Sequence, residues 1–84
     1  VGMNQGIQIS DRETWDDEKR AVCFPALVNG MQAMCAIEGA TLVRRFGEGL
    51  PLTLFREHRW DLEDEAQVLI LDQQEDAQGW IWFS

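Results

Sequence analysis

The sequence has few of the residues from which common functional sites are built. It contains one histidine and two cysteines among 84 residues. The metal- and redox-site spacings C-x-x-C and H-E-x-x-H are missing, as are the nucleophile motif G-x-S-x-G and a glycine-rich phosphate loop. These absences argue against an enzyme built on any of these motifs. We therefore expect no cofactor, no metal and no catalytic residue.

Basic residues are scarce as well. The chain has seven Lys and Arg and fifteen Asp and Glu, which gives a net charge of −8. A basic patch is the usual electrostatic mark of nucleic-acid binding, and basic clusters also attract proteins to anionic membranes. No apolar run approaches the ~20 residues that a membrane-spanning helix requires. We expect no direct nucleic-acid binding, no membrane association and a cytoplasmic location.

The remaining composition is typical of a folded globular protein. Hydrophobic residues make up 45% of the chain and charged residues 26%, which does not favour disorder. The length predicts one domain over residues 1–84. We expect Val1-Gly2, which precedes Met3, to be a remnant of cloning.

Asn29-Gly30, between two apolar runs, is the strongest local signal in the sequence. A type I′ turn requires positive φ at both central residues, and this dipeptide is the one that best adopts it. The turn predicts antiparallel strands over residues 21–28 and 31–37. Because side chains alternate along a strand, one shared face should point to the core. Its members are Val22, Phe24, Ala26, Val28, Met31, Ala33, Cys35 and Ile37.

This register makes two further predictions. Pro25 falls opposite Met34 at a position without hydrogen bonds, so the hairpin tolerates it. The other edge of its strand cannot be fully paired with a third strand around Pro25. Cys23 and Cys35 point to opposite faces, so we expect two buried, reduced thiols and no disulfide.

Elsewhere the chain predicts a strand over residues 6–10 and a polar loop over 11–20 anchored by Trp15. A short helix over 39–47 and a long helix over 51–74 follow, the second with an alternative break at Trp60-Asp61. The aromatic run 80–83 reads as a last strand beside 31–37. The fold class is therefore α+β. We expect about four antiparallel strands, one long helix on one face and a short helix, in the order β-β-β-α-α-β.

The long helix carries apolar residues on two sides. A stripe at helical spacing should pack on the sheet; it comprises Leu52, Phe55, Arg59, Leu62, Ala66, Leu69, Ile70 and Gln73. On nearly the opposite side lie Trp60, Asp64, Val68 and Leu71. Several apolar residues together on an outer face suggest a contact surface. This second stripe is the candidate interface, for a protein partner or, most simply, for a second copy in a homodimer.

A different interpretation places a site around the single histidine. His58 and Asp61 are three residues apart on a helix and could share a hydrogen bond, with Arg59 beside them. This arrangement is the alternative, a small-ligand-binding or enzymatic site. A third and weaker interpretation is DNA contact through Arg44, Arg45, Arg56 and Arg59.

The sequence resembles a family of small bacterial proteins, domain of unknown function 1488. The resemblance extends from Ile7 to Phe83 and rests on residues spread along the chain; they are Trp15-Asp16, Ala21-Val22-Cys23-Phe24-Pro25-Ala26, Asn29-Gly30, Cys35-Ala36-Ile37, Phe55, His58-Arg59, Leu62-Glu63 and Ala66. It implies a small stand-alone α+β protein and brings no established activity. Together these observations favour a non-catalytic protein-interaction or regulatory module.

Overall fold

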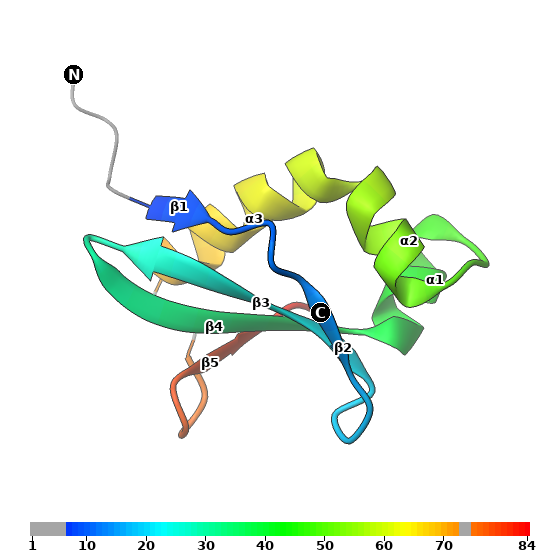
Figure 1. The fold of residues 1–84 in the computed structure, drawn as a ribbon, viewed down its shortest axis with the longest axis horizontal. Coiled ribbons are helices and arrows are strands. Elements are labelled where there is room, and N and C mark those ends of the chain that lie inside the picture. The colour runs from blue at the N-terminus through cyan, green and yellow to red at the C-terminus, as the bar shows by residue number, and fades with distance from the viewer. Residues whose placement is uncertain (1–6, 73–74) are drawn as a thin grey trace.

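The computed structural model describes residues 7–72 and 75–84. The elements are β1 (Ile7–Ile9), β2 (Thr14–Asp16), β3 (Ala21–Val28), β4 (Met31–Glu38), α1 (Gly39–Phe46), α2 (Pro51–Glu57), α3 (Arg59–Leu71) and β5 (Trp80–Trp82). The predicted α+β class is confirmed. Within these residues, the helices lie along one side of the sheet and none lies on the opposite side (Figure 1).

The β3–β4 hairpin forms in the predicted register. Val28 pairs with Met31 and Val22 with Ile37. Asn29 and Gly30 both have positive φ, 52° and 85°. The turn type that the dipeptide favours therefore sets the pairing of the two longest strands.

Replacing Gly30 with alanine should destabilise the protein by about 1 kcal/mol, because a side chain in the left-handed region is strained. A Cβ at this position would meet no atom within 4 Å, so backbone strain is the whole effect. Thermal unfolding should show a midpoint lower by roughly 4–8 °C. Asn29→Gly is the matched control and should leave the midpoint nearly unchanged. An unaltered Gly30→Ala midpoint would contradict the assigned turn.

The other edge of β3 is covered by two short strands rather than one. β1 pairs with residues 26–28 and β2 with residues 21–23. Pro25 lies between them, and its carbonyl accepts a hydrogen bond from the Ser10 N–H at 3.1 Å. The predicted interruption at Pro25 is thus present. The predicted loop over 11–20 is wrong in part, because Thr14–Asp16 is a strand; its polar residues carry no apolar alternation, and the free β3 edge supplies the pairing.

β5 joins the sheet beside β4, as predicted, but runs parallel to it. Trp80 pairs with Met34 and Trp82 with Ala36. The expectation of about four antiparallel strands is therefore met only in part: within the described residues the sheet is mixed and has five strands, of which β1 to β4 pair antiparallel. The helical connection from β4 crosses the sheet, so the chain re-enters it in the same direction.

The long helix is broken at His58, so the single helix expected over 51–74 is wrong. His58 has φ −114° and ψ 25°, outside the helical range, two residues before the alternative break at Trp60-Asp61. Leu54 and Phe55 of α2 are both buried, although they lie about 100° apart around the helix axis. The connection before α2 covers Leu54, since a Cβ at Gly49 would come 3.1 Å from its side chain. Gln73 and Gln74, the predicted end, lie outside the described residues.

The core lies between the sheet and the helices. Phe24 of β3 and Phe55 of α2 meet at its centre, with ring centroids 4.9 Å apart. The predicted inner stripe contributes Phe55, Leu62, Ala66 and Ile70 to the buried cluster, with Leu52 and Leu69 packed against it. Met31 is wrong as a core residue: it is 74% exposed, at the tip of the hairpin beyond the part of β4 that β5 covers. Leu54 and Phe83 are buried and were not predicted.

The two cysteines are free and buried, as the register predicted. Cys35 belongs to the core beneath the helices, and Cys23 to a smaller cluster on the other side of the sheet. Burial raises the pKa of the Cys35 thiol to about 12. This thiol is therefore protonated at neutral pH and is a packing group rather than a nucleophile.

Candidate functional site

Among the helices of the described residues, α3 has the most exposed hydrophobic side chains, and they lie on its outward side. Trp60, Val68 and Leu71 are 83%, 58% and 59% exposed. They share this side with Asp64, and we call the four residues the α3 outer face. The opposite side of α3 is buried through Leu62, Ala66 and Ile70. The residues predicted as an interface thus lie together in solvent on a helix that the core holds in place.

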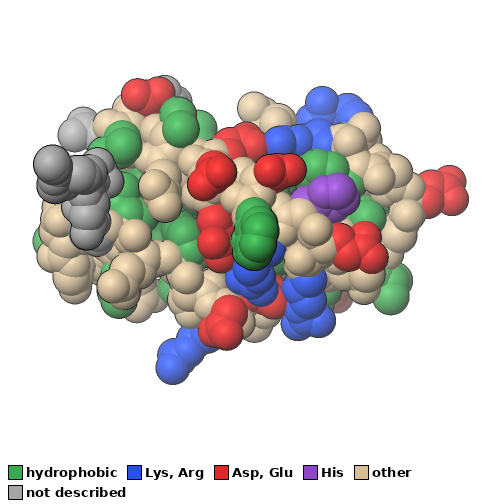
Figure 2. Space-filling view, turned by 90° about the horizontal axis from the view of Figure 1, so that it is seen from above, with side chains coloured by type: hydrophobic (Ala, Val, Ile, Leu, Met, Phe, Trp, Pro, Cys, Tyr) green, Lys and Arg blue, Asp and Glu red, His purple; other side chains and the backbone are tan. Residues whose placement is uncertain are grey.

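Acidic side chains lie on and beside the α3 outer face. Asp64 belongs to it, and Glu57, Asp61 and Asp72 lie near it; all four are exposed and, within residues 7–72 and 75–84, belong to no salt bridge. Figure 2 looks onto the helix side of the molecule, where red carboxylates stand around isolated green hydrophobic side chains. The surface is therefore both apolar and negatively charged.

The nearest arginines are engaged by a carboxylate that the sequence analysis had placed in a loop. Glu13, just before β2, is buried, with its side chain only 4% exposed. It accepts hydrogen bonds from Arg56 Nε at 2.8 Å and from Arg59 Nη2 at 2.5 Å. Arg59, the one charged residue of the predicted inner stripe, therefore points inward to an ion pair.

Opposing effects act on the ionisation of Glu13. Burial raises its pKa, whereas the hydrogen bonds from Arg56 and Arg59 lower it, and the lowering prevails. Arg59 Nη1 also lies 3.6 Å from Glu63 on the next turn of α3. The network ties β2 to α2 and α3 on either side of the helix break.

The residues of the alternative site lie around one shallow hollow of about 370 Å³. His58, Arg59 and Asp61 line it together with Trp60. The imidazole of His58 stacks on the Phe46 ring, with centroids 3.8 Å apart and planes 8° apart. No hydrogen bond joins His58 to Asp61 in the described part of the chain, and the Arg59 guanidinium is turned to Glu13.

The arginines considered for DNA contact do not form one basic patch. Arg45 is paired with Glu65 at 2.6 Å, and Arg56 and Arg59 with Glu13. Arg44 is exposed and makes no salt bridge among the described residues.

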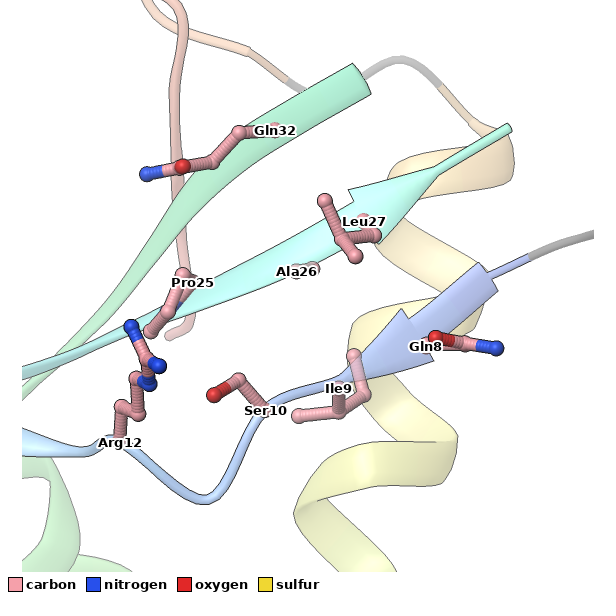
Figure 3. A pocket seen from close by; sticks show the side chains of 8 residues that line it. All are labelled: Gln8, Ile9, Ser10, Arg12, Pro25, Ala26, Leu27 and Gln32. Atoms are coloured by element: carbon pink, nitrogen blue, oxygen red, sulfur yellow. The ribbon is translucent and has the colours of Figure 1, made fainter. Parts of the chain in front are cut away.

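A hollow of about 410 Å³ lies on the side of the sheet away from the helices, where Pro25 separates the part of the β3 edge that pairs with β1 from the part that pairs with β2 (Figure 3). Gln8, Ser10, Arg12 and Gln32 supply its polar side chains, and Pro25 and Leu27 its apolar floor. No histidine, cysteine or carboxylate of the described residues lines it, so it holds no set for acid–base chemistry.

Two adjoining hollows, of about 690 and 450 Å³, meet at Trp15 and Pro51. Trp15 of β2 packs closely against the start of α1, since a Cβ added to Gly39 would come 3.0 Å from its ring. We call this pair the Trp15 hollows. The sequence predicts only an anchoring role for Trp15 and gives no sign of the Trp15 hollows.

The described residues contain no group of three or more His, Cys, Asp or Glu side chains that could hold a metal ion. None of the helices among them is long and apolar enough to cross a membrane.

Residues 7–83 match the model of the family described as "Protein of unknown function (DUF1488)". The chain belongs to this family. It is 60% identical over 83 residues to "Uncharacterized protein YrdB" of Escherichia coli (strain K12), covering 95% of this chain and 98% of that protein. The protein of the same name from Shigella flexneri matches equally well, at 60% over 83 residues.

A solved structure is similar over nearly the whole length. The crystal structure of a DUF1488 protein of unknown function from Shewanella loihica superposes with a TM-score of 0.91 at 34% identity, covering 98% of this chain and 96% of that one. The resemblance drawn from the sequence is confirmed. None of these names assigns an activity.

Proposed function

We propose that this DUF1488 chain is a non-catalytic protein-interaction module whose partner docks on the α3 outer face. The observation that carries the proposal is the 83% exposure of Trp60 on a helix whose other side is buried in the core. An exposed tryptophan on a rigid element loses little conformational entropy on binding, and tryptophan is enriched among residues that dominate binding energy. Val68 and Leu71 extend the apolar surface along the same side.

The charge around this face indicates the chemistry of the partner. Asp64 lies between Trp60 and Val68, and Asp61 and Asp72 flank the face. A two-fold pairing of α3 helices would bring these carboxylates together between two chains of net charge −8 each. A basic amphipathic helix, with Lys or Arg beside apolar residues, complements the same surface. A second copy is therefore the less favoured partner.

The Trp60→Glu substitution should weaken binding of a lysine-rich amphipathic helical peptide at least ~30-fold, or about 2 kcal/mol, because it removes the central apolar contact. Fluorescence anisotropy with the labelled peptide measures the loss. Stability should change by less than about 0.5 kcal/mol, since the side chain is exposed.

Leu50→Glu is the matched control, because Leu50 is 74% exposed and lies outside α3. Equal binding by wild type and Trp60→Glu would refute the α3 outer face as the docking surface. Light scattering over a concentration series tests the homodimer: a dimer that Trp60→Glu dissociates would identify a second copy as the partner.

Small-ligand binding beside His58 is the second candidate function. The shared hollow that His58, Arg59 and Asp61 line supports it. The stacking of His58 on Phe46 and the pairing of Arg59 with Glu13 engage two of these side chains within the fold. The interaction function is therefore the better supported of the two.

A further inference from the structure

The Trp15 hollows adjoin each other at the end of the molecule where α1 and α2 begin. Trp15 and Pro51 line both, so a ligand that lies across these two side chains can occupy the two hollows together. The ring of Trp15 is held against Gly39, and its indole N–H donates to Asp17 Oδ1 at 3.2 Å. The floor is thus a fixed aromatic surface, which favours binding because little order is lost there.

Exposed hydrophobic side chains gather around this floor. Trp15, Val43 and Leu50 are three of the eight large hydrophobic residues that are exposed among the described residues. Leu50, which is 74% exposed, stands in the connection that leads into α2. They come from β2, α1 and that connection, so the tertiary fold creates an apolar patch that no single element carries.

The charge of the lining is opposite to that of the whole chain. Three arginines line the Trp15 hollows, Arg20, Arg44 and Arg56, against one carboxylate, Glu38. The chain as a whole has fifteen acidic and only seven basic residues. Arg20 and Arg44 are in no salt bridge among residues 7–72 and 75–84, and Arg56 gives only its Nε to Glu13.

We propose that the Trp15 hollows bind an acidic, apolar peptide segment of another protein in an extended conformation. Its apolar side chains pack on Trp15, Pro51 and Leu50. Its carboxylates accept hydrogen bonds from the guanidinium groups of Arg20 and Arg44. An extended peptide is the form that we expect to reach both hollows, since they share Trp15 and Pro51 and successive side chains of a strand point to opposite sides. This ligand is opposite in charge to the partner proposed for the α3 outer face, and the two surfaces share no residue.

Short labelled peptides test this assignment on the whole chain. A peptide of alternating leucine and glutamate should bind, and its affinity should fall as salt rises. The Arg44→Glu variant should weaken it about tenfold or more, because one attraction becomes a repulsion. Leu50→Glu should weaken it similarly through the apolar patch.

Two controls separate this site from other surfaces. Arg12→Glu reverses an exposed arginine outside the Trp15 hollows, and Trp60→Glu alters the α3 outer face; neither should change binding of the leucine–glutamate peptide. Binding that is unaffected by both Arg44→Glu and Leu50→Glu would overturn the proposal. So would equal binding of a leucine–lysine peptide. A loss confined to Trp60→Glu would move the peptide to α3 and overturn it as well.

Discussion

Replacing Phe55 with alanine is expected to remove about 3–5 kcal/mol of stability, the largest loss that a single core truncation should produce in this chain. Phe55 is fully buried, its ring lies 4.9 Å from Phe24, and the Arg59 guanidinium carbon lies 5.4 Å from the ring centroid. The side chain therefore joins the core to the Glu13 network. A domain of this size has roughly 4–13 kcal/mol in total, so much of its stability depends on this one ring.

Thermal unfolding followed by circular dichroism measures the effect, and the midpoint should fall by on the order of 15–30 °C. Thr53→Ala, on the exposed side of the same helix, is the control and should stay within a few degrees. Phe55→Leu refills part of the cavity, so its unfolding midpoint should lie between those of Phe55→Ala and wild type. A Phe55→Ala midpoint close to that of wild type would mean that α2 does not pack on β3 as described.

The parts of the fold that the sequence predicts correctly are those that depend on neighbouring residues. Asn29-Gly30 and the alternating runs beside it determine a hairpin through local turn geometry, and every pair of that register is present. The direction of β5 depends instead on how the helical connection crosses the sheet. Thr14–Asp16 becomes a strand because β3 offers a free edge, which a segment of only three residues does not reveal.

The helix break at His58 interrupts a pattern that is continuous in the sequence. A stripe from Leu52 to Ile70 fits one straight helix, and it still packs inward in the structure. Leu54 lies off this stripe and is nevertheless buried, close to Gly49 of the connection that precedes α2. Periodicity alone gives no sign of such a break, because each half keeps the same spacing.

The two proposed binding surfaces also differ in how far the sequence predicts them. The α3 outer face lies on one helix, so its residues could be grouped from their spacing alone, and the structure places them together. The Trp15 hollows combine side chains from β2, α1 and α2. Glu13 meets arginines 43 and 46 residues away in the chain. Contacts at such separations leave no local pattern in a single sequence.

The Glu13→Gln substitution should destabilise the protein by about 2 kcal/mol at neutral pH, because it removes the charge that neutralises Arg56 and Arg59. Losses of about 3–5 kcal/mol are typical where the surviving partner is fully buried. The side chains of Arg59 and Arg56 are 21% and 57% exposed, so water compensates part of the loss. Urea unfolding at pH 7 measures the difference, with Glu57→Gln as a control at an exposed carboxylate in no salt bridge among the described residues.

The pH dependence distinguishes lost charge from lost packing. In the folded state burial raises the pKa of Glu13, but the hydrogen bonds from Arg56 and Arg59 outweigh this effect. The pKa of Glu13 therefore lies below its ordinary value of 4.5. A carboxyl with a depressed folded pKa stabilises the fold fully above its unfolded pKa, and this contribution disappears as the pH falls through the folded pKa. The difference between wild type and Glu13→Gln should therefore be largest near neutral pH and shrink as the pH falls below about 4.5. If the difference stayed constant across this range, the effect of Glu13 would be one of shape and not of charge.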